Sequence, residues 1–108
     1  MLAKKNRADV KTVKQIFKIG KFFTSPNLTF KFILKHNSDS PHISFIVPKS
    51  IAKLAVKRNK LRRRGYHILK TYMKDFPLGL VGVFVFKKYQ DDILIIEDEI
   101  KTILHKIN

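Results

Sequence analysis

The sequence predicts a small single-domain α+β protein, an α/β sandwich in which helices pack on a sheet in the order α-β-β-β-α-β-α. Its 108 residues give room for one modest core, and 44% apolar residues are enough to fill it. Apolar residues recur at helical spacing in three segments and alternate, or run continuously, in others. No internal repeat or low-complexity linker separates these segments, so we expect residues 1–108 to form one domain.

The first predicted element is a short helix over residues 9–19. Its apolar residues fall at helical spacing, and lysines occupy a different face. Asp9 is a suitable N-cap and Gly20 a suitable terminator. The apolar positions are Val10, Val13, Ile16 and Phe17. We assign Phe17 to the core; the alternative is a partly exposed aromatic on which a base can stack.

Strands are predicted in the region that follows. Residues 28–35 alternate in the manner of a strand with one buried face, formed by Leu28, Phe30, Phe32 and Leu34. Residues 43–47 form a second strand, and the turn-forming residues 37–41 between the two predict an antiparallel hairpin. A further short strand is predicted at 21–24.

The second half of the chain predicts a long helix at 54–74, a strand at 80–86 and a closing helix at 93–106. The strand is apolar on both faces, which is typical of a central strand covered on both sides. Gly65 costs about 1 kcal/mol relative to Ala in a helix interior, and close packing against the sheet would explain it. The buried stripe of the long helix is predicted to contain Leu54, Leu61, Gly65, Ile68 and Tyr72.

Charge is distributed very unevenly along the chain. The formal net charge is +15, and residues 1–74 contain 19 Lys and Arg against two Asp. Six of the eight residues in 57–64 are cationic, with Leu61 as an apolar anchor within them. A cationic surface of this kind favours a polyanion, because each phosphate contact releases a condensed counterion. We therefore infer a nucleic-acid partner; an anionic membrane surface and a merely soluble basic protein are the alternatives.

The sequence carries no sign of an active site or of a targeting segment. It has no cysteine, and His36, His42, His67 and His105 are scattered without the spacing of a metal site. It contains no Gly-rich phosphate loop and no nucleophile motif. No apolar run is long enough for a membrane span, so a cytoplasmic protein without catalytic residues, bound metal or other cofactor is expected.

Two stretches, taken together, resemble the protein subunit of bacterial ribonuclease P. They are Ser44-Phe45-Ile46-Val47-Pro48-Lys49 and Ala55-Val56-Lys57-Arg58-Asn59-Lys60-Leu61-Arg62-Arg63. A strand that ends near a Ser-Lys-Lys element, followed by an Arg-Asn block that opens a long helix, is typical of that family. The Lys4-Lys5-Asn6-Arg7 segment and the Ile16-Phe17-Lys18-x-Gly20 segment are also similar, so the resemblance covers nearly the whole chain.

The resemblance implies a fold like the second domain of ribosomal protein S5, with a left-handed β-α-β crossover through 43–47, 54–74 and 80–86. Right-handed crossovers are the strong default, so the residues alone do not predict this one. The implied partners are the catalytic RNA subunit and precursor tRNA, with the protein monomeric on its own. The implied activity is Mg²⁺-dependent endonucleolytic removal of the 5′ leader, with Mg²⁺ and the chemistry carried mainly by the RNA.

The resemblance also implies roles for particular residues. The RNA-binding set is Lys49, Lys53, Lys57, Arg58, Asn59, Lys60, Arg62, Arg63 and Arg64. A cleft for the single-stranded leader would be lined by Val13, Phe17, Thr29, Lys31 and Ser44.

The chain departs from the family pattern at several of these positions. Lys60 replaces an Arg and cannot make its planar bidentate phosphate contact, and Val13 replaces a second Phe in the leader cleft. Ser50, Gly65 and Tyr66 also differ from the usual residues. Two other functions are considered: a stand-alone nucleic-acid-binding module such as a ribosomal protein, and a small nuclease in its own right.

Overall fold

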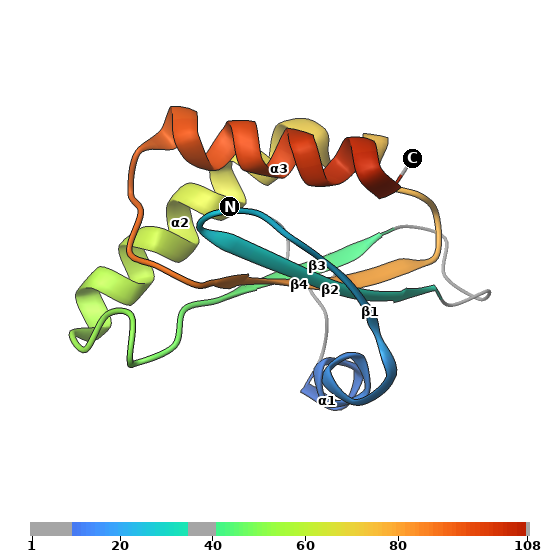
Figure 1. The fold of residues 1–108 in the computed structure, drawn as a ribbon, viewed down its shortest axis with the longest axis horizontal. Helices are drawn as coiled ribbons and strands as arrows, with labels where there is room; N and C mark the ends of the chain where they lie inside the picture. Colours follow the sequence, from blue (N-terminus) through green and yellow to red (C-terminus); the bar gives the residue numbers. More distant parts are fainter. Residues whose placement is uncertain (1–9, 35–40, 108) are drawn as a thin grey trace.

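The computed structural model describes residues 10–34 and 41–107, which form three helices, a short 3-10 turn and four strands (Figure 1). Two helices lie on one face of the sheet and the first helix lies on the other (Figure 1). The elements are α1 (Val10–Ile19), β1 (Lys21–Thr24), β2 (Leu28–Leu34), β3 (His42–Ile46), α2 (Ala55–Tyr72), η2 (Met73–Asp75), β4 (Leu80–Phe86) and α3 (Ile93–Ile107). The predicted α+β sandwich is confirmed, including the short strand at 21–24.

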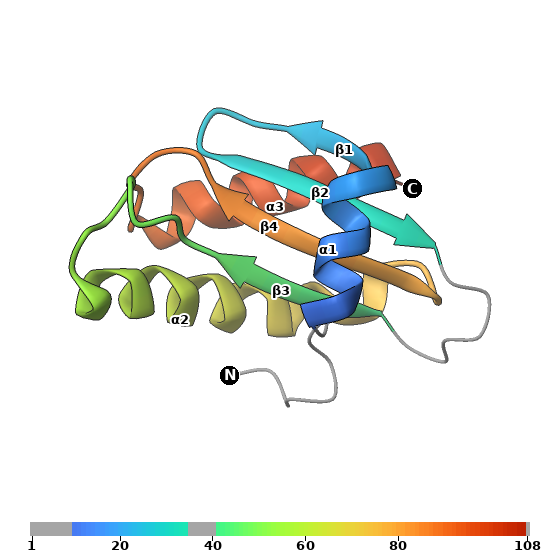
Figure 2. The same cartoon turned by 90° about the horizontal axis from the view of Figure 1, so that it is seen from below.

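The sheet has the strand order β1-β2-β4-β3 (Figure 2). β1 pairs antiparallel with β2, β2 pairs antiparallel with β4, and β3 pairs parallel with β4. β4 is therefore an interior strand, as its two apolar faces predicted. Its odd residues Val81, Val83 and Val85 face α1, and its even residues, from Leu80 to Phe86, face the other two helices.

The predicted hairpin of residues 28–47 is wrong. β2 and β3 run in opposite directions but are not neighbours, because β4 is inserted between them. Alternation in a sequence indicates which face of a strand is buried, but it does not identify the strand's partner. The turn at 37–41 falls mostly outside the described residues, as does the proposed N-cap Asp9.

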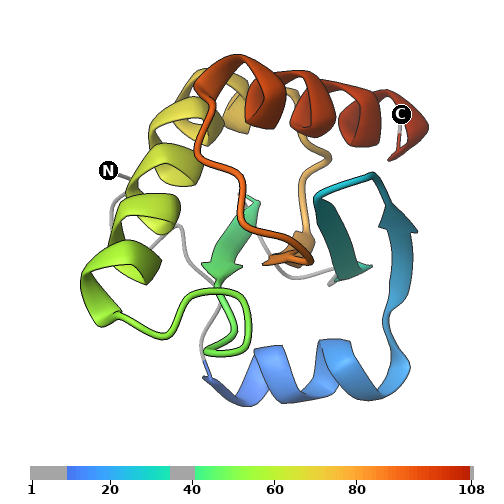
Figure 3. The same cartoon turned by 60° about the vertical axis from the view of Figure 1, so that its left-hand side comes forward.

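The connection from β3 through α2 to β4 is a left-handed crossover. Both strands run in the same direction, and α2 lies on the face of the sheet opposite to α1 (Figure 2). With the strands pointing at the viewer, α2 lies above the sheet and the path moves from β3 to its neighbour β4 in the left-handed sense (Figure 3). The rare handedness that the resemblance implied is thus present in this fold.

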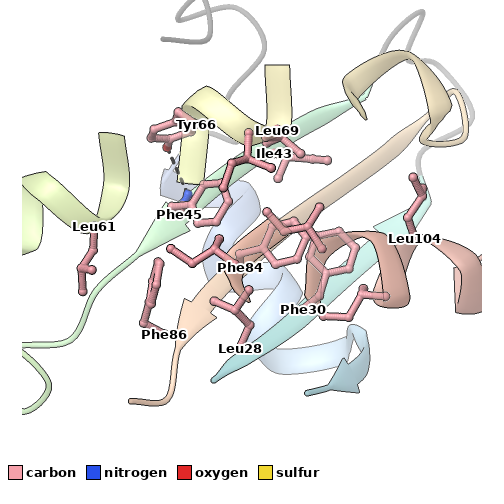
Figure 4. Packing of buried hydrophobic residues seen from close by; sticks show 14 of the residues in the cluster. Leu28, Phe30, Ile43, Phe45, Leu61, Tyr66, Leu69, Phe84, Phe86 and Leu104 are labelled. Carbon is pink, nitrogen blue, oxygen red and sulfur yellow. Dashed lines mark hydrogen bonds between the residues drawn. The ribbon is translucent and has the colours of Figure 1, made fainter. Parts of the chain in front are cut away.

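The main core lies between the sheet and the pair α2 and α3, and it is rich in phenylalanine (Figure 4). The Phe30 and Phe84 rings are 4.3 Å apart between centroids, and Phe45 stacks on Phe84 at 5.0 Å. Two glycines make room for these rings. A Cβ on Gly82 would lie 2.4 Å from the Phe30 ring, and a Cβ on Gly65 would lie 2.6 Å from the Phe45 ring. Close packing against the sheet therefore explains the glycine inside α2.

α2 buries a broader surface than predicted. Leu61, Gly65 and Ile68 are buried as expected, and Tyr66 and Leu69 are buried with them. Leu54 precedes the helix and is exposed, contrary to its predicted place in the stripe, because the helix begins only at Ala55. The wider stripe arises because α2 contacts both β3 and α3.

Three polar contacts join the elements of this core. The Tyr66 hydroxyl accepts a hydrogen bond of 3.0 Å from the Phe45 backbone N–H, which satisfies a donor on the outer edge of β3 (Figure 4). The Tyr72 hydroxyl donates to Glu97 Oε2 at 3.0 Å. Its partial burial, with the carboxylates of Glu97 and Asp75 nearby, raises the pKa of that hydroxyl above 10.0.

The third contact fixes the β1–β2 turn to α3 through Glu99, which is almost fully buried. Glu99 Oε1 accepts from the Asn27 backbone N–H at 2.8 Å and from the Ser25 hydroxyl. Glu99 Oε2 accepts from Asn27 Nδ2 at 2.6 Å. A buried carboxylate is tolerated here because its oxygens are hydrogen-bonded from two directions.

Candidate nucleic-acid interface

The cationic block 57–64 lies entirely within α2, which the main core holds in place. Leu61 is fully buried under the block, and Gly65 and Ile68 continue the buried stripe one and two turns later. With that stripe directed inward, the cations on either side must point outward or along the flanks. The block is therefore an ordered part of the surface, and its two flanks differ in what they contact.

The first flank consists of Lys57, Lys60 and Arg64, and it faces the β4–α3 connection. Lys60 Nζ lies 3.2 Å from Asp91 Oδ2, and Arg64 Nη1 lies 3.8 Å from the same atom. Arg64 also donates to the backbone carbonyl of Asp91. Lys57 Nζ lies 5.7 Å from the centroid of the Tyr89 ring. Two of these three cations share one carboxylate that remains accessible to water, so this flank keeps a net positive charge.

The second flank consists of Arg58, Asn59, Arg62 and Arg63. Arg58 Nη1 donates to the carbonyl oxygens of Ala52 at 2.9 Å and Lys53 at 2.7 Å, so it fixes the linker that precedes the helix. The Arg62 guanidinium donates to the Asn59 side-chain oxygen. Arg63 is exposed and makes no hydrogen bond or ion pair within residues 10–34 and 41–107. None of these four residues pairs with a carboxylate in the described part of the chain.

The linker between β3 and α2 presents two more cations. Its turn is closed by hydrogen bonds to the Pro48 carbonyl from the N–H groups of Ile51 at 3.0 Å and Ala52 at 3.3 Å. Ala52 is buried, which anchors the linker, while Lys49 and Lys53 are exposed on either side of it. The linker leads directly into the first turn of α2, so its lysines continue the cationic surface of the helix (Figure 3).

A hollow of about 350 Å³ lies between α2 and the start of α3. It is lined by Lys60, Arg63, Arg64, His67 and Ile93. His67 is exposed and follows Arg63 by four residues, so it lies on the same helix face one turn later. His67 is not among the site residues predicted from the sequence, although this spacing would have indicated it.

The second candidate surface is the face of the sheet that α1 partly covers. Ile16 of α1 packs there on Val81 and Val83, forming a small second core that Val13 joins. The strand register places Lys31 beside Val83 and Ser44 beside Val83 on its other side. The sheet residues of the predicted leader cleft therefore lie on this face, next to α1.

The five predicted cleft residues differ in exposure. Phe17 is 43% exposed, so its assignment to the core is wrong and the alternative of a partly exposed aromatic is correct. Lys31 Nζ lies 4.6 Å from the Phe17 ring centroid. Thr29 and Lys31 are partly exposed, whereas Val13 packs against the small core and Ser44 is only 9% exposed. The accessible part of this surface thus comes from Phe17, Thr29 and Lys31.

One aromatic residue of this surface was not found from the sequence. Phe22 of β1 is paired with Lys31 in the register, so its side chain lies on the α1 face, and it is 63% exposed. Lys31 therefore has an accessible aromatic ring near it on α1 and another on β1. Phe22 and Phe23 are consecutive in a strand, so only one of them can enter the main core; this rule predicts that one of the two rings lies outside it.

Neither surface contains a recognisable metal centre. Within the described residues, no three His, Asp or Glu side chains come close enough together to hold a metal ion. The same part of the chain contains no helix that is long and apolar enough to cross a membrane. His36 lies outside the described residues, and His42, His67 and His105 are on three different elements.

The fold and these surfaces define a class: a small α+β protein that presents ordered cations on one helix and a lysine over an exposed aromatic ring on one sheet face. The sequence matches the family model of Ribonuclease P over residues 4–108, and the chain belongs to that family. The family places it in ribonuclease P, in tRNA processing, and implies a partnership with the ribonuclease P RNA. A search of curated proteins by sequence gave no significant match.

Solved structures of ribonuclease P proteins have the same fold. A Staphylococcus aureus ribonuclease P protein mutant, described as defective in mRNA degradation activity, is 18% identical with a TM-score of 0.83. That comparison covers 95% of this chain and 88% of the other. The ribonuclease P protein of Thermotoga maritima is 21% identical with a TM-score of 0.81, covering 94% of this chain and 97% of the other. At these identities the likeness supports the fold.

Proposed function

We propose that this chain binds the ribonuclease P RNA through α2 and its linker, and the 5′ leader of precursor tRNA through the α1 face of the sheet. In this way it assists the Mg²⁺-dependent removal of the leader. The RNA-binding set is Lys49, Lys53, Lys57, Arg58, Asn59, Lys60, Arg62, Arg63 and Arg64, to which we add His67. The leader-binding set is Phe17, Thr29 and Lys31 with Phe22, above the less exposed Val13 and Ser44.

One observation carries most of this proposal: the six cations of residues 57–64 are held on a rigid helix, and among the described residues only Lys60 and Arg64 pair with a carboxylate, that of Asp91. Such an arrangement keeps its charge available for phosphates, and its geometry is fixed before binding. Arg58 serves this surface in a second way. By holding the Ala52 and Lys53 carbonyls, it orients the linker on which Lys53 is exposed.

The leader-binding role is supported by the chemistry of the α1 face. Single-stranded RNA is bound by aromatic rings that stack on bases and by cations that contact the backbone. Phe17 and Phe22 supply exposed rings, and Lys31, the register partner of Phe22, supplies the cation. Lys31 lies over the Phe17 ring, and that position would bring a phosphate near a base stacked on the ring.

Mg²⁺ is assigned to the RNA in this proposal. Within the described residues, no three potential metal-binding side chains lie together. The protein's own contribution would be to bind and orient the RNA subunit and the leader.

The direct test is reconstitution with the ribonuclease P RNA encoded by the same genome. We expect the protein to lower the Mg²⁺ concentration needed for leader removal and to increase affinity for precursor over mature tRNA. Both quantities are measured by cleavage and binding assays across a Mg²⁺ titration. A protein that leaves both unchanged would contradict the proposal.

Two other functions predict different results in the same assays. A stand-alone module such as a ribosomal protein would bind ribosomal RNA tightly and have no effect on leader removal. A nuclease would cleave RNA as a purified protein free of any RNA subunit. For the described residues, no feature of the structure favours either function over the ribonuclease P assignment.

A further inference from the structure

A second hollow, of about 490 Å³, lies at the end of the sheet where β1 begins and β2 ends. The C-terminal end of α3 lies beside the start of β1 at this place (Figure 2). The hollow has the size of an ordinary ligand site and is separate from both surfaces described above. Its lining includes Lys21, Phe23, Phe32, Pro77, Lys106 and Ile107.

The apolar part of this hollow is the outer end of a row of aromatic rings. Phe23 stacks on Phe32 with centroids 5.8 Å apart and planes inclined by 17°. Phe32 in turn stacks on Phe30 at 5.5 Å and 15°. Phe30 and Phe32 are buried, whereas Phe23 is only half-buried. Phe23 therefore ends the row where the hollow opens, with its ring supported from behind by Phe32.

The polar part of the hollow is cationic. Lys21 on β1 and Lys106 on α3 are both exposed, and none of the described residues that line the hollow is acidic. Within the described ranges, neither lysine forms an ion pair with a carboxylate. An aromatic floor with two available ammonium groups is complementary to an unpaired nucleotide, because the base can stack while its phosphate contacts the lysines.

We propose that this hollow binds a single unpaired nucleotide of the RNA partner, with the base against Phe23 and the phosphate between Lys21 and Lys106. The proposal rests on the proposed function for the identity of the RNA, but it describes a different site. Phe22 and Phe23 are paired with Lys31 and Phe30, respectively, so their side chains lie on opposite faces of the sheet. A single strand of RNA bound at the α1 face would not enter this hollow without passing around the edge of the sheet, which is formed by β1.

The first experiment uses the isolated, isotope-labelled full chain and three small probes. Adenosine 5′-monophosphate, adenosine and inorganic phosphate are each titrated while backbone amide chemical shifts are recorded. We expect the monophosphate to shift the amides of Lys21, Phe23, Lys106 and Ile107 and to bind at least fivefold more tightly than either fragment. Shifts confined to α2 or the α1 face, or equal binding of inorganic phosphate alone, would overturn the proposal.

Substitutions then separate the two halves of the site. Lys106→Gln should reduce monophosphate affinity but leave adenosine affinity unchanged, because it removes only the phosphate contact. Phe23→Leu keeps an apolar side chain but removes the stacking face, so it should weaken both ligands by about fivefold, near the lower limit for base stacking. Lys101→Gln, an equal charge change on the same helix outside the hollow, is the control. A loss of binding in Lys101→Gln as large as in Lys106→Gln would refute the site.

Thermal unfolding of each variant shows whether the fold is retained, and Lys106→Gln covers the case in which Phe23→Leu is unstable.

Failure of the nucleotide site is distinguishable from failure of the proposed function. If the monophosphate does not bind at this hollow while the protein still lowers the Mg²⁺ requirement of its RNA, only the nucleotide site is wrong. If the monophosphate binds at this hollow but the protein does not lower the Mg²⁺ requirement, the nucleotide site is correct and the protein binds a different RNA.

Discussion

The two faces of the sheet are built from the same kinds of residue but are covered to different extents. The face under α2 and α3 is closed, and its phenylalanines are buried in contact with one another. The face under α1 is covered only in part, by a small core around Ile16. Beside that small core, Phe17 and Phe22 are exposed and Lys31 is partly so. Phenylalanine is thus a core residue on one face and a candidate ligand-binding residue on the other.

This difference arises from how many elements cover each face. Two long helices are sufficient to exclude water from four strands, whereas the ten residues of α1 are not. The stability of the fold therefore comes mainly from the closed face, because burial of apolar surface is the main stabilising contribution. The open face can carry polar and aromatic residues for binding at little cost to stability.

The largest effect is expected from truncation of the same residue type on the two faces. Phe30→Ala should lower the free energy of unfolding by about 3–5 kcal/mol, because it empties the space beside Gly82 and Phe84. Phe22→Ala should change it by less than about 0.5 kcal/mol, because that ring is mostly exposed. Urea denaturation measures both. Comparable losses in the two variants would show that the α1 face is as structural as the closed face.

Gly65→Ala should destabilise the protein, although alanine is the better helix former. The added methyl group would lie 2.6 Å from the Phe45 ring, and Phe45 cannot move freely because it stacks on Phe84. Overpacking costs about 1–3 kcal/mol, against which the helix gains about 1 kcal/mol. Lys70→Ala, at an exposed position of the same helix, is the control. A Gly65→Ala variant more stable than the native protein would mean that the closed face has spare room.

Arg62→Ala and Phe17→Ala should separate the binding roles of α2 and the α1 face. Arg62→Ala is expected to weaken assembly with the RNA subunit and reduce its salt dependence by about one phosphate contact. Phe17→Ala should leave assembly unchanged and weaken binding of the leader by roughly 1–3 kcal/mol if a base stacks on the ring. Filter binding at several salt concentrations, with and without a leader on the tRNA, measures both. Equal effects of the two variants on both ligands would contradict the assignment of separate roles.

Much of this arrangement was predictable from the sequence, and the failures have physical reasons. The central position of 80–86 follows from its apolar residues on both faces, and the helical cationic block follows from the spacing of Leu61 and Ile68. The partner of β3 was not predictable, because the interior strand β4 comes 34 residues after β3 ends and periodicity carries no information about pairing. The exposure of Phe17 depends on how far α1 covers the sheet, which is a property of the tertiary structure.

The contacts that the cations make within the protein were also not predictable from the sequence. Asp91 lies 27 residues after Arg64, and only the return of the chain through β4 brings it to α2. Arg58 was assigned to RNA binding alone, yet its guanidinium also holds the linker carbonyls. A count of charges predicts the polyanion partner, but it does not identify which cations are already engaged within the protein.

The smallest predicted effect concerns the two cations that already pair with Asp91 within the protein. Asp91→Asn removes the carboxylate shared by Lys60 and Arg64, and its effect on stability should be below about 1 kcal/mol, because the pair is accessible to water. Affinity for the RNA subunit should rise slightly and its salt dependence should steepen, because two cations become available. Asp98→Asn makes the same charge change on the exposed surface of α3, away from α2. If both variants bind RNA equally well, only the total charge matters. If Asp91→Asn instead weakens binding, Asp91 positions these cations for the phosphates, and the first flank is as preorganised as the second.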